Sequence, residues 1–386
     1  MKTHNHFCNR CILPEGFLGL TFNKEGLCNY CADPDYTNPN WSRRHISEHQ
    51  KTEALKDWNE TIKYLQDTKE EREYDCVLGY SGGKDSTALL DMLIHDYKLR
   101  PLAITIDNGQ MPDIAKDNID KTLTTLDYTG HHFFINQAIP TFSKLYRYLF
   151  LHHSSNEEML ASSICGYCSD LIHGILVKEA LKRHISVIVL GYSPDQVKRY
   201  FYEIPPEEIR LNWHPEFIQE KPFTALDRNF FLKTEDLKEL GNVLPRILLA
   251  YHALPYEETS IIEQVNEKGL IKKGKADPIL TNCHVIKAAM IYDFHRFGGM
   301  YYALQYAELV RQASNGKNLS KARKKWLRLY KYIAKSILSG TFAKQQITKF
   351  LSQIDLTKGE LLNKTSQYLE QDPNKDTILK IKGFIS

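Results

Sequence analysis

Seven consecutive residues, from Ser81 to Thr87, carry the side chains best suited to chemistry in this chain. The two glycines let the backbone approach a ligand closely, while the hydroxyls, the backbone N–H groups and the Lys84 ammonium can donate to phosphate oxygens. The Asp85 carboxylate would repel a phosphate, so we expect it to bind Mg²⁺ instead. The stretch therefore predicts a phosphate cradle for a nucleotide. Its predicted binding residues are Ser81, Gly82, Gly83, Lys84, Asp85, Ser86 and Thr87.

The elements on either side of this loop fit that role. The apolar run 74–80 predicts a buried strand, and apolar residues at helical spacing over 87–94 predict a helix. A strand, a glycine turn and a helix N-terminus together form an anion site, because the helix dipole and its unpaired N–H groups favour negative charge. The spacing matches neither the Walker loop nor the dinucleotide-binding glycine motif.

The sequence Ser-Gly-Gly-Lys-Asp-Ser at 81–86 resembles the signature of the PP-loop ATP pyrophosphatases. Weaker similarity extends over about residues 73–200. The resemblance implies an α/β fold with an open parallel sheet and helices on both faces. It also implies that ATP is split into pyrophosphate and AMP, that AMP is placed on a substrate oxygen, and that a nucleophile then displaces AMP. Lys84 and Asp85 are the expected catalytic residues of the loop.

Four cysteines near the N-terminus form two Cys-x-x-Cys pairs, at 8/11 and 28/31, with sixteen residues between them. This spacing is typical of a four-thiolate Zn²⁺ site, and four thiolates leave no open position, which favours a structural role. The segment is too short to bury a core, so the metal would hold it folded. Its sequence also resembles the N-terminal ribbon of N-acetyl sugar amidotransferases of the PP-loop superfamily. The predicted zinc ligands are Cys8, Cys11, Cys28 and Cys31.

Three further cysteines are candidates for a second centre. Cys165 and Cys168 are expected to precede a helix over 170–183, and Cys283 to precede a helical region that continues to about 312. Helix starts stabilise thiolates and gather at the carboxyl edge of a parallel sheet. The arrangement resembles the iron–sulfur tRNA thiolases, which implies that these three cysteines are catalytic and hold a [4Fe–4S] cluster. The alternatives are a redox pair at 165/168 and a buried apolar role for Cys283.

Further strands are expected at 101–107, 131–135 and 187–191. Asp107 and Gly191 stand at strand ends, where open parallel sheets bind ligands, so both are expected to contact the nucleotide. Asp107 or Asn108 can bond to the ribose or the adenine, and a simple turn cap is the alternative. The turn that follows reads Gly191 to Gln196, without the histidine and the final aspartate that the tRNA thiolases carry there.

Composition sets broad limits. A chain of 386 residues, 25% charged and with net charge +3, suggests two or three domains and demands neither a membrane nor a large nucleic-acid surface. No apolar run approaches membrane-span length, so a cytoplasmic protein without a membrane partner is expected. The basic run 317–335 predicts an amphipathic helix, either solvated or touching phosphates. The predicted domains are a zinc ribbon (1–35), a helical linker (36–72), a PP-loop ATP-binding α/β domain (73–235) and a mostly helical region (236–386).

Three functions remain open. Sulfur transfer is favoured by the second set of cysteines, and would thiolate a tRNA or a small molecule with a sulfur carrier as partner. Nitrogen transfer is supported by the ribbon, and would place ammonia from a partner glutaminase on an N-acetyl sugar in surface polysaccharide biosynthesis. A nucleotide-binding regulator without catalysis is the third function, against which the intact Lys84-Asp85-Ser86 argues. A homodimer is compatible with each of them.

Overall fold

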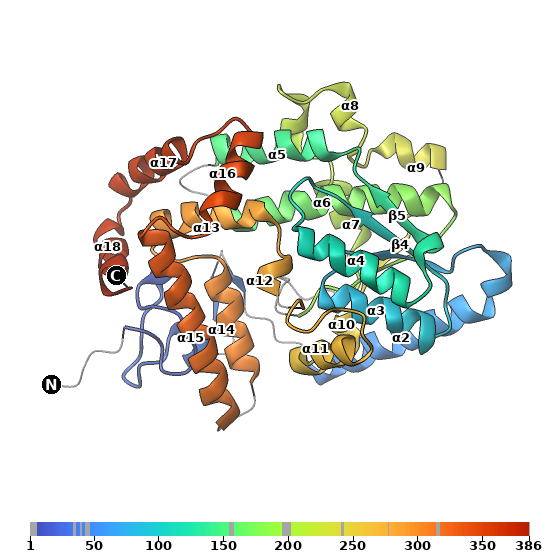
Figure 1. The fold of residues 1–386 in the computed structure, drawn as a ribbon, viewed down its shortest axis with the longest axis horizontal. Coiled ribbons are helices and arrows are strands. Elements are labelled where there is room, and N and C mark those ends of the chain that lie inside the picture. The colour runs from blue at the N-terminus through green and yellow to red at the C-terminus, as the bar shows by residue number, and fades with distance from the viewer. Residues whose placement is uncertain are drawn as a thin grey trace. The chain divides into compact units, whose positions relative to one another are not determined.

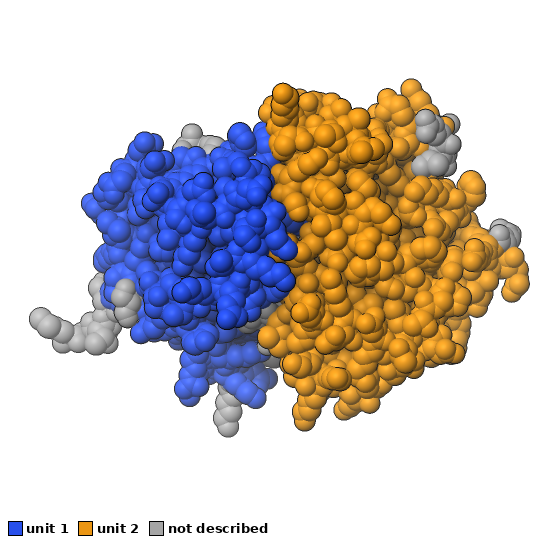
Figure 2. Space-filling model, turned by 45° about the horizontal axis from the view of Figure 1, so that its top comes forward, with its two compact units in different colours: residues 1–45, 146–165, 284–386 blue, residues 46–145, 166–283 orange. Residues whose placement is uncertain are grey.

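The structure is a computed structural model that describes residues 6–33, 36–38, 41–42, 47–153, 158–194, 202–240, 243–276, 278–313 and 317–385. The chain forms two compact units, coloured separately in Figure 2. Unit 1 comprises residues 1–45, 146–165 and 284–386, and unit 2 comprises residues 46–145 and 166–283.

A five-stranded parallel sheet forms the centre of unit 2. Its strands are β3 (Cys76–Gly79), β4 (Pro101–Ile106), β5 (His132–Ile135), β6 (Val187–Leu190) and β7 (Arg246–Leu249), in the order β5-β4-β3-β6-β7. The predicted open parallel α/β sheet is confirmed, and β7 is an addition to the expected strands. β3, β4 and β6 read as nearly continuous apolar runs because both of their faces are buried.

Helices cover this sheet (Figure 1). Those of unit 2 are α2 (Glu48–Asp67), α3 (Lys84–His95), α4 (Asp113–Thr125), α7 (Pro206–Asn212), α8 (Ala225–Arg228), α9 (Thr234–Leu240), α10 (Ala250–Ala253), α11 (Glu258–Glu267) and α12 (Pro278–Thr281), with short 3₁₀ turns at Lys69–Glu71, Thr129–His131 and Glu216–Gln219. α2 begins at a capping box between Ser47 and Gln50 and buries Trp58 in the core shared with β3 and α3. The charged segment before the sheet is therefore an amphipathic helix of this unit.

The order of the strands determines where a ligand can bind. From β3 the chain moves outward to β4 and β5, then returns to the other side of β3 to form β6 and β7. The direction of winding therefore reverses between β3 and β6. The carboxyl ends of strands at such a switch point flank an open crevice, which is where α/β sheets bind their ligands. The loop after β3 and the residues after β6 both lie at this point.

Unit 1 contains the four N-terminal cysteines and the C-terminal helices. Its elements are a 3₁₀ turn at Phe17–Gly19, α1 (Asn29–Ala32), β1 (Thr37–Asn38), β2 (Trp41–Ser42), α13 (His284–Phe297), α14 (Tyr302–Gln312), α15 (Lys317–Leu338), α16 (Lys344–Gln353), α17 (Lys358–Glu370) and α18 (Lys375–Ile385). The helical C-terminal region is therefore confirmed. Two more helices, α5 (Ile139–His152) and α6 (Leu160–Lys182), contribute residues to both units.

α6 begins at Leu160 and not at residue 170, so the prediction that Cys165 and Cys168 precede the helix is wrong: both lie inside it. The reason is a cap from a distant part of unit 1. The buried Asp293 carboxylate accepts the N–H groups of Leu160 at 2.8 Å and of Ala161 at 3.2 Å. Such a bond satisfies the unpaired donors of a helix start, and no local sequence signal reveals it.

α6 is also, within the described ranges, the one helix long and apolar enough to cross a membrane by length and composition. No apolar run of that length is evident from the sequence alone. In the structure, 56% of the relevant 18-residue window is buried inside the protein. Buried core helices share this composition, so the apolar character of α6 is accounted for by its burial.

Candidate active site

The phosphate loop runs from the end of β3 into α3, as predicted. Gly82 has φ +71°, and a Cβ there would lie 2.4 Å from the Ala115 carbonyl oxygen, so only glycine fits. The loop is closed by its own side chains, since the Ser81 and Ser86 hydroxyl oxygens lie 3.1 Å apart and Ser86 Oγ donates to the Gly83 carbonyl. This closure holds the N-terminus of α3 next to the loop, the geometry that favours anions.

Gly191 forms the second side of the site. It follows β6 directly, and a Cβ at this position would lie 3.1 Å from the backbone nitrogen of Ser86. The close approach of the two backbones therefore leaves little room for a side chain at this position. The turn beyond Gly191 is described as far as Pro194; the predicted turn residues Asp195 and Gln196 lie outside the described residues.

A cavity of about 290 Å³ opens between these two segments, entirely within unit 2. Its apolar lining comes from the sheet, from α6 and from the segment between β4 and α4, and includes Ile104, Ile106, Met111, Ile172, Leu176 and Leu190. Its polar lining includes Ser81, Lys84, Asp85, Ser86, Asn108 and His173. A mostly apolar slot with a few converging polar groups is typical of a small-molecule site, and the phosphate loop forms one of its walls.

Asp107 and Asn108, at the end of β4, take different positions. Asp107 is buried and its carboxylate accepts the Gly109 N–H at 2.8 Å and the Lys116 ammonium at 3.0 Å, as a turn cap does. Asn108 lines the cavity, and its Nδ2 lies 3.9 Å from the Cys168 sulfur. Of the two residues that the sequence offered for the ribose or the adenine, Asn108 is the one whose side chain is placed to contact a ligand.

Cys283 also lines the cavity, immediately before α13 as predicted. The segment that leads to it is fastened to α4. Asn118 Nδ2 donates to the carbonyls of Gly82 at 3.3 Å and Lys275 at 3.2 Å, and so bridges the phosphate loop to this segment. Cys168 and Cys283 belong to unit 2 and Cys165 to unit 1. The convergence of all three on one cluster stays a prediction.

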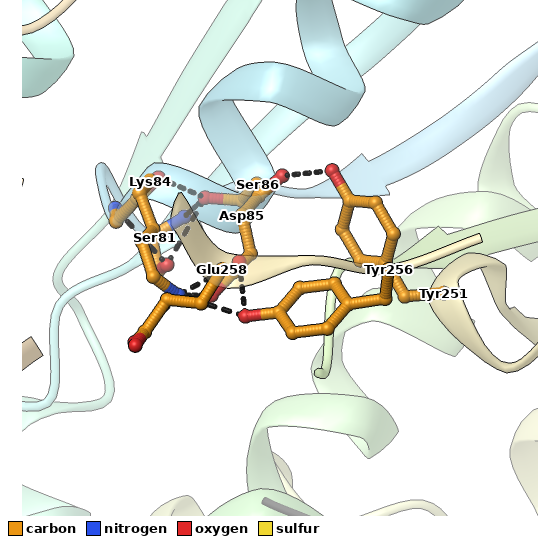
Figure 3. Close-up of polar contacts among 8 residues, drawn as sticks. Ser81, Lys84, Asp85, Ser86, Tyr251, Tyr256 and Glu258 are labelled. Carbon is orange, nitrogen blue, oxygen red and sulfur yellow. Dashed lines mark hydrogen bonds and ion pairs between the residues drawn. The ribbon is translucent and has the colours of Figure 1, made fainter. Parts of the chain in front are cut away.

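The Lys84 ammonium contacts Asp85 and two further side chains, Tyr256 and Glu258, that were not predicted from the sequence (Figure 3). It lies 2.7 and 2.9 Å from the two Asp85 carboxylate oxygens, donates to the Tyr256 hydroxyl at 3.0 Å, and lies 3.8 Å from Glu258 Oε1. The Tyr251 hydroxyl donates to the Asp85 carbonyl at 3.0 Å. Tyr251, Tyr256 and Glu258 all follow β7, more than 160 positions from the loop, and belong to no local motif.

His173, on α6, is the histidine of the cavity wall. Its Nε2 lies 3.2 Å from the Tyr192 hydroxyl, and its ring contacts that of Trp213. Burial lowers the pKa of His173 to about 4, because a buried imidazolium loses its hydration. The imidazole is therefore neutral at physiological pH and can orient a ligand by hydrogen bonding without adding charge.

The four N-terminal cysteines of unit 1 form a separate centre. Their sulfurs all lie within 4.8 Å of one another and are buried; within the described part of the chain this is the one such group of three or more His, Cys, Asp or Glu side chains. Cys11 and Cys28 Sγ are 3.6 Å apart, close to the edge of a tetrahedron with Zn–S bonds of about 2.3 Å. The Cys28 N–H donates to Cys8 Sγ at 3.3 Å, as in outer-shell bonds to metal thiolates. The donor set fits a structural metal ion.

Comparison with known proteins gives partial matches. No protein-family model matches the chain. It is 37% identical over 70 residues to an uncharacterized protein of Methanocaldococcus jannaschii, covering 16% of this chain and 25% of that protein. It is 30% identical over 122 residues to a tRNA-cytidine(32) 2-sulfurtransferase of Deinococcus radiodurans, covering 30% of this chain and 36% of that protein. The chain thus matches about a quarter to a third of the length of these relatives.

Two solved structures are also similar. A U34-tRNA thiolase of Methanococcus maripaludis, solved with its [4Fe–4S] cluster, aligns with TM-score 0.33 and 14% identity over 86% of this chain and 88% of that one. An NMN synthetase of Francisella tularensis aligns with TM-score 0.32 and 12% identity over 72% of this chain and 93% of that one. In its loop sequence and its parallel sheet, the chain resembles the PP-loop ATP pyrophosphatases.

Proposed function

We propose that this chain is an ATP-dependent enzyme that adenylates a carbonyl or amide oxygen of its substrate and then exchanges AMP for sulfur. The observation that carries the proposal is that the phosphate loop and Cys283 line the same cavity. Cys168 lies next to Asn108, which is part of the wall of this cavity. The matched stretch of the tRNA 2-sulfurtransferase supports the same chemistry and makes tRNA the first acceptor to test.

The reaction has two displacement steps. The substrate oxygen attacks the α-phosphorus of ATP, and the bond from that phosphorus to pyrophosphate breaks. The loop N–H groups and Lys84 stabilise the negative charge on the departing pyrophosphate. Mg²⁺ held by Asp85 would neutralise more of that charge. A sulfur nucleophile then attacks the activated carbon, and the carbon–oxygen bond to AMP breaks.

The thiols Cys165, Cys168 and Cys283 are the proposed catalytic cysteines. A [4Fe–4S] cluster on three thiolates would keep one iron open for a sulfide. Anaerobically purified protein is expected to be brown and to lose its colour in each of the three Cys→Ser variants. Thiolated nucleoside should form from tRNA, ATP and sulfide. Colourless wild-type protein that releases pyrophosphate but transfers no sulfur would refute sulfur transfer.

Nitrogen transfer is the second candidate. It is favoured by the ordered four-cysteine centre, whose sequence resembles the ribbon of N-acetyl sugar amidotransferases, and it needs no thiolates in the cavity. Ammonium chloride can replace the glutaminase in a test with an N-acetyl sugar nucleotide and ATP, followed by mass spectrometry. Pyrophosphate release that depends on the sugar and on ammonium would establish this function. If neither acceptor causes pyrophosphate release, the remaining function is that of a nucleotide-binding regulator without catalysis.

A further inference from the structure

The segment between α10 and α11 brings two side chains to the Lys84 ammonium. The Tyr256 hydroxyl lies 3.0 Å from Lys84 Nζ and 3.1 Å from Asp85 Oδ1, and the Tyr256 ring centroid is 5.7 Å from the ammonium. Glu258 Oε1 lies 3.8 Å from the same nitrogen. Figure 3 shows all four side chains around one point. Tyr256 and Glu258 thus give the Lys84 ammonium two partners besides Asp85.

Lys84 and a metal ion would compete for Asp85. The Lys84 side chain is 3% exposed, so its charge depends on protein partners in place of water. In this structure the ammonium contacts both Asp85 carboxylate oxygens, the same atoms that would bind Mg²⁺. Binding of Mg²⁺ must therefore weaken the Lys84–Asp85 ion pair. A buried ammonium left without a carboxylate would be strongly unfavourable.

We propose that Tyr256 and Glu258 are positioning residues for Lys84, which hold its ammonium beside the loop when Mg²⁺ takes over Asp85. The inference rests on the proposed function, in which Asp85 binds the metal and Lys84 the phosphates. Glu258 supplies the carboxylate that Lys84 loses to the metal, and Tyr256 keeps a hydrogen bond to the ammonium throughout. The two residues thereby favour metal binding at Asp85 without touching the metal.

The positions of Tyr256 and Glu258 are fixed by the packing of α11 on α3. Lys268 Nζ, near the end of α11, lies 2.5 Å from Asp91 Oδ2 on α3. At the other end, the Glu257 carboxylate caps α11 by accepting the N–H groups of Thr259 and Ser260. Glu257 is exposed and engaged in the cap, while its neighbour Glu258 faces Lys84. Glu263, which is exposed on the same helix, offers a matched control.

The test uses Mn²⁺ as the metal probe and α,β-methylene-ATP as a nucleotide that cannot be cleaved at the α-phosphorus. Electron paramagnetic resonance measures Mn²⁺ affinity in the full-length protein, and pyrophosphate release is titrated with Mg²⁺ in parallel. Glu258→Gln should weaken Mn²⁺ binding about tenfold, the size of one hydrogen bond to a charged group. Tyr256→Phe should act in the same direction, Glu258→Asp should recover part of the loss, and Glu263→Gln should match the wild type.

The same Glu258→Gln substitution, made in a Lys84→Ala variant, distinguishes a positioning role of Glu258 from direct binding of the metal by Glu258. In Lys84→Ala protein, Glu258→Gln should no longer change Mn²⁺ affinity, because the proposed effect acts through the lysine. An equal loss in that background would make Glu258 a metal ligand and overturn the proposal. Identical affinities of Glu258→Gln and Glu263→Gln would also overturn it. Pyrophosphate release by the wild type tests the proposed function separately. The Mn²⁺ affinities test the positioning role of Tyr256 and Glu258 whether or not pyrophosphate is released.

Discussion

Asp85 is the residue on which the proposed chemistry depends most directly, because its carboxylate is the acidic group of the phosphate loop. We expect Asp85→Asn to fold, since an amide of the same shape can still accept from Tyr256 and Lys84. It should lose Mg²⁺-dependent pyrophosphate release by at least about a hundredfold, because a neutral amide binds Mg²⁺ poorly. Circular dichroism and a coupled pyrophosphate assay measure both properties. Turnover at the wild-type rate would mean that the metal is held elsewhere.

His173 gives the cavity a pH dependence of stability. The pKa of His173 is about 4 in the folded protein and about 6.5 when unfolded, so between these values the unfolded state binds the extra proton. The free energy of unfolding should therefore fall as the pH drops from 6.5 to 4, by up to about 3 kcal/mol from this residue. Urea titrations of wild type and His173→Gln across this range measure the difference.

The comparison of variants isolates His173 from other groups, since burial also lowers the pKa of His295 to about 4. His173→Gln should flatten part of the decline. His184→Gln, at an exposed position, should leave the decline unchanged. Equal slopes in His173→Gln and the wild type would contradict the buried neutral imidazole.

At the scale of elements, the turn between β3 and α3 requires its glycine. Gly82→Ala would force a side chain into φ +71° and to within 2.4 Å of the Ala115 carbonyl oxygen on α4. We expect it to lower the free energy of unfolding by about 2 kcal/mol or more and to abolish pyrophosphate release. Urea unfolding and the pyrophosphate assay test this. Gly130→Ala, with no atom within 4 Å of its Cβ, is the control and should change neither quantity.

Local patterns were sufficient to predict this part of the molecule. β3, β4, β5 and β6 are short apolar runs that end in polar turns, and a glycine turn before a helix has few other uses. Gly191 was predicted to contact the nucleotide because the strand ends of a parallel sheet meet at one edge, and the structure places it beside the loop. Each strand and the glycine turn is encoded by contiguous residues, and the general rule for parallel sheets supplies the rest.

Features that depend on distant residues could not be predicted in this way. The start of α6 is determined by Asp293, more than 130 positions away, which moves Cys165 and Cys168 from a helix start into a helix. Tyr256 and Glu258 reach Lys84 only because α11 packs on α3. Each of these contacts is a tertiary one, formed by residue types common in any helix or loop.

At the scale of the whole molecule, the N-terminal cysteines and the C-terminal helices of unit 1 depend on each other. Arg323 on α15 donates to the carbonyls of Cys8 and Cys11 at 2.7 to 3.2 Å. Arg311 on α14 is buried, with its guanidinium 5.4 Å from the Tyr30 ring centroid. A Zn²⁺ ion on four thiolates would carry a net charge of −2, which Arg323 and Arg311 would partly offset, although Arg311 is also paired with Glu308 at 2.7 Å.

This packing predicts what happens when the metal is removed. Purified protein should contain about one zinc per chain, and Cys28→Ser should lose it. Without the metal, nothing holds the four-cysteine segment folded, so Arg323 loses the carbonyls of Cys8 and Cys11, and Arg311 loses the Tyr30 ring but keeps Glu308. Hydrogen exchange should then rise in 6–33 and along α14 and α15 more than in the sheet of unit 2. Metal analysis and exchange mass spectrometry measure the two effects.

Cys283→Ser is the matched control, because it removes a thiol from unit 2 and leaves the four-cysteine group intact; its zinc content and the exchange of α15 should equal those of the wild type. Protein made with zinc supplied and found to contain none would exclude a zinc centre. Zinc loss in Cys28→Ser without faster exchange in α14 and α15 would show that the contacts of Arg323 and Arg311 stabilise the helices independently of the metal. The predicted pattern is distinctive because exchange increases in residues nearly 300 positions from the mutated cysteine, through contacts that unit 1 alone contains.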